Sequence, residues 1–293
     1  MSTGADWADL LAELDRWALA GRRIALWLRD DDAVAPSGQL DRLAALGERF
    51  TVPVLLASIP LLAEEPLARR LESAPMLFPC QHGVTHENHA PAPQKKAEVG
   101  NHRPPDVALA EIAQGWRRLR ELFGARALPV FVPPWNRIDP AIALALPGIG
   151  LAGLSCFRKF SLGAPGSPVL VNTDLDLIDW HGGRAGRHAN DLLAEMLALL
   201  VQRRTRMAGD TQFGLLLHHR DHDAACWAFL EELLARIGSH AAIDFVTPQA
   251  LFALPVDLER AAAGAMVAGS IGAFSVPRRP SDPPAEDATR DVP

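Results

Sequence analysis

Three consecutive aspartates, Asp30, Asp31 and Asp32, closely follow an apolar run at residues 24–28. Adjacent carboxylates repel one another, so such a run needs either open solvent or a cation beside it. Two interpretations follow from the sequence. The run is either a solvated loop that caps a helix expected near Ser37, or part of a metal site at the exit of a buried strand.

A second segment, His-Gly-Val-Thr-His, places His82 and His86 four residues apart. On a helical turn this spacing brings both imidazoles to one face. Two histidines and a carboxylate with an open coordination position are a usual catalytic zinc set. We therefore predict a divalent-metal site at Asp32, His82 and His86, with His89 as a further ligand or a hydrogen-bonding neighbour. Zinc is favoured by two nitrogens and one oxygen, and cobalt, nickel or iron fit the same set.

Two more histidines, His218 and His219, follow a late apolar run at residues 213–217. Strand alternation allows only one of them to point into a site at the end of that strand. An imidazole facing a reacting group is suited to general acid catalysis, and the alternative is a histidine hydrogen-bonded in the core or at the surface. Trp135 and Trp180 lie at two other strand ends, where they either line a sugar-binding mouth or pack in the core.

Short apolar, β-branched runs alternate along the chain with longer segments of helical periodicity. Strands are expected at residues 24–28, 52–58, 76–80, 129–133, 151–157, 175–180, 213–219 and 243–247. Helices are expected within the first 23 residues and at about 38–50, 61–73, 106–123, 189–208 and 223–237. This repeat predicts a parallel sheet with both faces covered, and seven or eight units make a closed barrel as good an interpretation as an open sheet.

The unusual polar residues fall at the carboxyl ends of five of these strands. In a parallel barrel those ends converge on one mouth. We therefore expect residues that are distant in the sequence to share one pocket there: the aspartate run, His82, His86, Trp135, Asn136, Asp179, Trp180 and His218.

Composition restricts the class of protein and of partner. A chain of 293 residues with 48% hydrophobic content suits one large α/β domain, predicted at residues 1–270 and followed by a disordered, Pro-rich tail at 271–293. The formal net charge of −6 argues against a nucleic-acid partner. The sequence shows neither a membrane span nor a signal peptide, so a cytoplasmic protein is expected. Cys80, Cys156 and Cys226 are expected to be reduced core thiols.

These motifs, in this order, resemble those of the polysaccharide deacetylase family, which includes chitin-oligosaccharide and peptidoglycan deacetylases. The family's aspartate pair after the first strand is matched within residues 30–32, and its His-Ser/Gly-x-x-His motif by residues 82–86. Its Asp-x-x-Asp-Trp motif is matched by residues 176–180, and its closing Leu-x-His by residues 216–218. The matches extend from about residue 24 to residue 219.

The third motif departs from the family pattern. Members carry Arg-x-Pro, in which the arginine holds the base aspartate. Here Phe131 stands in the place of that arginine. Arg29 and Arg137 are the two residues that we consider as replacements in space.

The resemblance implies a distorted (β/α) barrel with fewer than eight regular strands, and hydrolysis of an N-acetyl amide by metal-activated water. Asp31 would be the general base and Asp32 a metal ligand. The register can slip by one residue, which would give these roles to Asp30 and Asp31. The implied substrate is a carbohydrate or a related small acylated molecule.

By the same resemblance, His218 would protonate the leaving amine, and Asp176 or Asp179 would orient it. Two rival functions remain. One is another metal-dependent hydrolase, a phosphoesterase or an amidohydrolase, although those usually carry His-x-His at the first strand. The other is a non-catalytic metal- or carbohydrate-binding barrel, which the missing third-motif arginine favours. The residues expected to contact substrate are Trp135, Asn136 and Trp180.

Overall fold

The structure is a computed structural model that describes residues 5–163, 165–206 and 211–254. Its centre is one sheet of nine strands, which pair in the order β6-β5-β4-β3-β2-β1-β10-β7, with β11 added beside β1. All of these pairings are parallel. The strands are β1 (Ile24–Ala33), β2 (Val54–Ser58), β3 (Leu77–His82), β4 (Val130–Val132), β5 (Gly153–Leu154), β6 (Val169–Leu170), β7 (Leu175–Asp176), β10 (Gln212–Leu217) and β11 (Ile243–Phe245).

The two ends of this sheet are joined by a short stretch of chain in place of a β-ladder. Thr173 donates its backbone N–H to the carbonyl of Cys156, 3.1 Å away on the β5 side. The next residue, Asp174, donates to the carbonyl of Gly214 in β10, at 2.7 Å. Consecutive residues therefore bond to chain segments near opposite ends of the sheet, which confirms the predicted distorted barrel of parallel strands.

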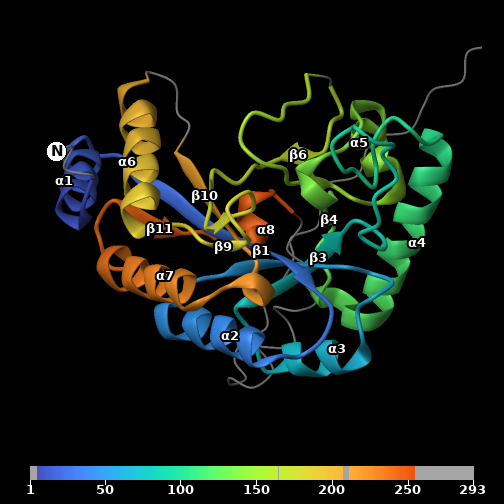
Figure 1. Ribbon diagram of the computed structural model, residues 1–293, viewed down its shortest axis with the longest axis horizontal. Helices are drawn as coiled ribbons and strands as arrows, with labels where there is room; N and C mark the ends of the chain where they lie inside the picture. Colours follow the sequence, from blue (N-terminus) through green and yellow to red (C-terminus); the bar gives the residue numbers. More distant parts are fainter. Residues whose placement is uncertain (1–4, 164, 207–210, 255–293) are drawn as a thin grey trace, which may run out of the picture. The chain divides into compact units, whose positions relative to one another are not determined.

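The longer helices lie around the outside of the sheet, and each of them except α1 follows a strand in the chain (Figure 1). Ser37 begins α2 as predicted, because its hydroxyl accepts from the N–H of Leu40 at 3.1 Å. The sequence pattern missed the short helices α5 and α8. The α-helices are α1 (Trp7–Leu19), α2 (Gly38–Phe50), α3 (Glu65–Glu72), α4 (Pro105–Phe123), α5 (Pro140–Ala145), α6 (Ala189–Thr205), α7 (Ala224–Ile237) and α8 (Pro248–Leu251).

Burial explains why the strands read as unbroken apolar runs. Every residue of β2 is buried, because the barrel interior covers one face and the helices cover the other. The three cysteines are buried and free of disulfides, as predicted. Among the described residues, no helix is long and apolar enough to cross a membrane. The predicted tail at 271–293, and the last part of the predicted domain, lie outside the described residues.

Two expected elements differ from the structure. The first strand does not end before the aspartates, since β1 continues through them to Ala33. The strand expected at 175–180 is divided. Leu175–Asp176 forms β7 of the barrel, whereas β8 (Ile178–Asp179) turns away into an antiparallel hairpin with β9 (Ala185–Gly186). The division places the two aspartates of this segment in different surroundings.

Candidate metal centre and its surroundings

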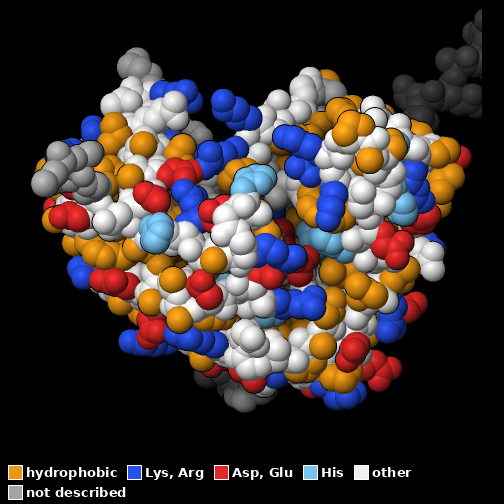
Figure 2. Space-filling view, viewed as in Figure 1, with side chains coloured by type: hydrophobic (Ala, Val, Ile, Leu, Met, Phe, Trp, Pro, Cys, Tyr) orange, Lys and Arg blue, Asp and Glu red, His pale blue; other side chains and the backbone are white. Residues whose placement is uncertain are grey.

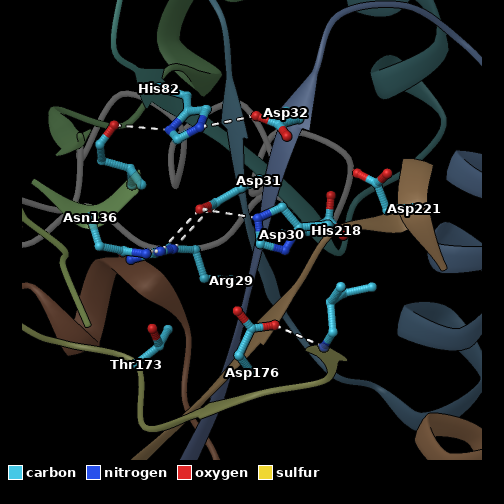
Figure 3. A network of polar contacts seen from close by, with 12 residues as sticks. Arg29, Asp30, Asp31, Asp32, His82, Asn136, Thr173, Asp176, His218 and Asp221 are labelled. Atoms are coloured by element: carbon cyan, nitrogen blue, oxygen red, sulfur yellow. Dashed lines mark hydrogen bonds and ion pairs between the residues drawn. The ribbon is translucent and has the colours of Figure 1, made fainter. Parts of the chain in front are cut away.

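The end of β1 sends its three consecutive aspartates to three different partners. The register of β1 against β2 shifts between Asp30 and Ala33, and Asp32 has a left-handed φ of 74°. This bulge breaks the simple alternation of side chains at the end of the strand. Asp30 contacts a histidine and Asp32 contacts the histidine pair. Asp31 contacts an arginine, and Figure 3 shows this pair together with the contact of Asp32 with His82.

Asp32, His82 and His86 form a group that could hold a metal ion, since one ligand atom from each lies within 4.8 Å of the others. Asp32 Oδ1 is 3.1 Å from Nε2 of His82 and 3.4 Å from Nε2 of His86. This oxygen is buried and has no hydrogen-bond partner, which fits a ligand for a cation. His82 Nδ1 donates to the carbonyl of Val132 at 3.0 Å, so its Nε2 carries the free lone pair. Two nitrogens and one oxygen suit a divalent transition metal, and His89 is not in the group.

The charges of this group act on one another. Burial opposes the charged form of Asp32, but close contact with His82 and its charge lower the pKa of the carboxyl. Burial also acts against protonation of His82, yet the carboxylates of Asp31 and Asp32 outweigh it and raise the pKa of that imidazole. Burial and the neighbouring His82 lower the pKa of His86. His86 is thereby held in the neutral form that metal ligation needs.

The loop that carries His86 is held by one buried carboxylate, Glu98. Its Oε1 accepts from the backbone N–H groups of Thr85 and His86, at 2.8 and 3.1 Å, and its Oε2 accepts from that of Val84 at 3.0 Å. The helical turn expected over this motif is wrong, because Gly83 and His86 both have left-handed φ angles, of 53° and 62°. A side chain at position 83 would place its Cβ 1.9 Å from Glu98 Oε2, so glycine is required there. The histidines still meet, through a folded loop.

Asp31 is held by Arg29, two residues earlier on the same strand. Arg29 donates from Nε and Nη2 to the two carboxylate oxygens of Asp31, at 2.9 and 3.0 Å, and both side chains are almost fully buried. Arg29 also donates to Ser155 Oγ at 2.8 Å and to Asn136 Oδ1 at 2.6 Å. Such a two-pronged pair fixes the plane of the carboxylate as well as its position.

Of the two arginines considered as replacements for the third-motif arginine, Arg29 is the one that contacts Asp31. Phe131, which stands in the place of the family arginine, is a fully buried core residue of β4. Arg137 does not replace it, because its guanidinium donates to the carbonyl of Lys96 at the surface, at 2.7 Å.

His218 lies on the other side of Asp31, with Nε2 4.0 Å from Asp31 Oδ2 (Figure 3). Trp180 meets the His218 ring edge to face at 4.6 Å and donates from Nε1 to Asp176 at 2.8 Å. Burial raises the pKa of the Asp176 carboxyl. The charge of His218 and the two hydrogen bonds to the carboxylate act in the opposite direction but do not outweigh burial. Asp179 lies instead in an exposed turn, where its carboxylate accepts from two backbone N–H groups. Of the two aspartates considered for orienting His218, the structure places Asp176 beside it.

The neighbouring His219, in the turn that follows β10, is buried in the protein. Its Nδ1 is 2.5 Å from Asp30 Oδ1, and its backbone N–H donates to Asp30 Oδ2 at 2.8 Å. His222 accepts from the backbone N–H of His218 at 3.3 Å. Burial lowers the pKa of His222 to about 4, which keeps it neutral and able to accept. Asp30, which would be the general base if the motif were shifted by one residue, is therefore already paired with His219 in the core.

The predicted aromatic residues both contact the site. The Trp135 ring lies 4.5 Å from that of His86, and Trp180 packs on His218. Asn136, predicted to contact substrate, also accepts a hydrogen bond from Arg29. Sequence reasoning missed the bracing role of Glu98. One sequence feature could have indicated this role: Glu98 lies twelve residues beyond His86 in a loop, and not on the face of a helix.

No protein-family model and no curated protein sequence matches the chain. The fold resembles that of a protein from Mycobacterium smegmatis with a provisional assignment as a polysaccharide deacetylase, at a TM-score of 0.59 and 14% identity, covering 86% of this chain and 96% of that one. It also resembles a mutant of a CE4-family pseudoenzyme with restored enzymatic activity, at a TM-score of 0.53 and 15% identity, covering 78% and 68% of the two chains. Identities this low establish the fold alone. The chain has the distorted-barrel fold of the CE4 polysaccharide deacetylases, in a divergent sequence.

Proposed function

We propose that this chain is a metal-dependent deacetylase that hydrolyses an N-acetyl amide of a carbohydrate or a related small molecule. One observation carries the proposal. A carboxylate held by an arginine lies between a candidate metal group and a histidine, which are the components that amide hydrolysis needs (Figure 3). The fold shared with the Mycobacterium smegmatis protein provisionally described as a polysaccharide deacetylase supports it.

Asp32, His82 and His86 would hold the metal. A divalent cation such as zinc supplies polarisation of an acyl carbonyl and a lower pKa of water when bound in such a set. Asp31 would then act as general base. Arg29 fixes both of its oxygens, so the carboxylate accepts a proton from the attacking water without first reorienting.

His218 would complete the reaction as general acid. Water attack forms a carbon–oxygen bond, and departure of the amine breaks the carbon–nitrogen bond. The proton of the water passes to Asp31, and a proton from His218 Nε2 passes to the leaving nitrogen. The 4.0 Å between His218 Nε2 and Asp31 Oδ2 suits two groups acting on neighbouring atoms of one small reacting centre. Trp135 and Trp180, on the His86 and His218 sides, offer apolar faces for a sugar ring.

Metal content and acetate release, measured together on purified protein, test the proposal. We expect Asp32→Ala to lose metal, because two imidazoles leave the cation under-coordinated and its charge uncompensated. Asp31→Asn should keep metal but lose a factor of about 10²–10⁴ in turnover, because an amide cannot accept the proton. Asp139→Asn is the matched control, since Asp139 caps α5 and asparagine caps as well as aspartate.

Each contrary result identifies a different error. Loss of metal from Asp31→Asn, with metal retained by Asp32→Ala, would contradict the assignment of the two aspartates. Metal bound without acetate release from any acetylated sugar would indicate a non-catalytic binding barrel. Hydrolysis of generic phosphate esters instead would indicate a phosphoesterase.

A further inference from the structure

We propose that the substrate carries an anionic group, a phosphate ester or a carboxylate, which binds to Arg220 and Lys96 beside the candidate metal centre. This inference rests on the proposed function and narrows its substrate class. It is carried by two exposed cations, one bonded to the backbone of Asp32 and the other over the Trp135 ring that packs on His86. Neither has a carboxylate partner among residues 5–163, 165–206 and 211–254.

Arg220 follows β10 and reaches back to the end of β1. Its Nη1 donates to the backbone carbonyl of Asp32 at 3.2 Å, while the residue as a whole is exposed. A backbone carbonyl satisfies one N–H of a guanidinium that carries five. The remaining N–H groups can therefore bind an oxyanion directly beside a candidate metal ligand.

Lys96 approaches the same centre from the long loop between β3 and α4. Its exposed ammonium lies 5.9 Å from the centre of the Trp135 ring, and that ring lies 4.5 Å from His86. A cation over an indole face is attracted to the ring, which positions the side chain without neutralising its charge. Lys96 is thus held near the second histidine of the candidate metal group.

Nearby carboxylates do not balance these two cations. Asp30 and Asp31 are already paired in the core, and Asp221 is paired with Arg184 at 3.1 Å. Asp32 and the buried Glu98, whose carboxylate accepts from the backbone of the His86 loop, carry two negative charges, which a divalent cation would neutralise. Two further positive charges beside that cation are mutually repulsive unless an anion joins them. A substrate oxyanion would relieve this repulsion.

The positive mouth contrasts with the rest of the molecule. The whole chain has 35 acidic against 29 basic residues, yet two exposed cations, Arg220 and Lys96, lie at this one place. On the face seen in Figure 2, Lys and Arg side chains lie near histidines, with acidic side chains among them. General solubility does not require cations to be placed at this point of an acidic protein. A local positive potential of this kind attracts an anionic ligand and raises its association rate.

Kinetics on three N-acetylated sugars test the inference: N-acetylglucosamine, its 1-phosphate, and N-acetylmuramic acid, which carries a carboxylate. We expect kcat/KM for at least one anionic sugar to exceed that of the neutral sugar by about tenfold, a preference that weakens as ionic strength rises from about 0.05 to about 0.5 M. Which anionic sugar is preferred distinguishes phosphate from carboxylate. Arg220→Gln and Lys96→Gln should each reduce the preference, measured as the ratio of kcat/KM for the anionic sugar to that for the neutral sugar, about threefold or more.

Arg69→Gln, on the exposed surface of α3, is the control and should leave the preference intact. Calorimetric binding of glucosamine 1-phosphate, which has no acetyl group to lose, separates this inference from the proposed function. Binding that Arg220→Gln weakens, in a protein that hydrolyses none of the sugars, would reject the deacetylase proposal and retain the anion site. Equal kcat/KM for neutral and anionic sugars, or a preference unchanged in both variants, would overturn the anion site.

Discussion

Replacing Arg29 with methionine should be the most damaging single change at the site that leaves every candidate metal ligand in place. The substitution removes five hydrogen bonds, two of them to Asp31, and leaves that carboxylate buried without a partner. Removing one member of a buried ion pair costs about 3–5 kcal/mol, because the remaining charge is uncompensated. At about 2–4 °C per kcal/mol for a domain of this size, we expect the melting temperature to fall by about 6–20 °C.

A double-mutant cycle measures whether the pair itself is responsible. Arg29→Met, Asp31→Leu and the double variant would be unfolded with urea in the presence of a chelator, so that bound metal does not contribute. Replacing both partners with apolar groups should restore much of the loss, giving a coupling free energy of about 2 kcal/mol or more. A single-variant loss below about 1 kcal/mol, or strict additivity, would refute the argument that Arg29 holds Asp31.

Arg29→Lys then separates positioning from folding. Lysine keeps the charge, but a single ammonium cannot reproduce the planar fork that fixes both oxygens of Asp31. We expect a folded protein with normal metal content and an acetate-release rate reduced about 10–100-fold, which is the cost of a slightly misplaced catalytic group. Unaltered turnover would show that the orientation of Asp31 does not depend on the guanidinium.

Three further predictions concern the surroundings of the same centre. Metal at about 100 times its dissociation constant should raise the melting temperature by about 5–11 °C, corresponding to about 2.7 kcal/mol, and should leave Asp32→Ala unchanged. Glu98→Gln exchanges one accepting oxygen for an NH₂ donor that faces backbone N–H groups. Isothermal titration should therefore show a metal affinity about 10–100-fold weaker, while the circular dichroism spectrum stays unchanged. An unaltered affinity would show that Glu98 does not hold the His86 loop for metal binding. Burial disfavours the charged form of His219, but the Asp30 carboxylate outweighs it and raises the pKa of the imidazole above its ordinary value of 6.5. The stability that this pair contributes is therefore complete below about pH 6.5 and declines as the pH rises through the higher pKa of the folded state. The difference in unfolding free energy between wild type and His219→Gln should then become smaller with rising pH. A difference that does not change with pH would contradict the pairing.

Much of the fold follows from local patterns that tertiary packing reinforces. The apolar runs became barrel strands because burial on both faces demands apolar side chains throughout, as in β2. The Ser37 hydroxyl caps α2 because that cap depends only on residues within one turn. The two-residue strands β5 and β6 and the passage from Thr173 to Asp174 depend on distant backbone partners. A local sequence pattern does not predict which distant backbone groups these residues will bond to.

The candidate site shows the same division between local and distant causes. The pairing of His82 with His86 was predicted, although the helical turn expected to bring them together does not form. A glycine at position 83 and the carboxylate of Glu98 fold the loop instead. Arg29 was one of two arginines considered for Asp31. The sequence could not decide between the two arginines, because it does not show that Ser155, which follows β5, accepts a hydrogen bond from Arg29 Nη1.

The three aspartates show most clearly why sequence could propose the metal site yet leave its register open. On a regular strand Asp30 and Asp32 would share one face, with Asp31 on the other, and shifting the register by one would exchange every role. The bulge at the end of β1 removes that symmetry, and the left-handed backbone of Asp32 turns its carboxylate toward the histidines. Each carboxylate then has its own compensating charge or candidate cation, so three neighbouring negative charges can lie in a largely buried place. Their adjacency is tolerable because each has a different partner: His219 after β10, Arg29 on β1 itself, and the histidine pair at the end of β3.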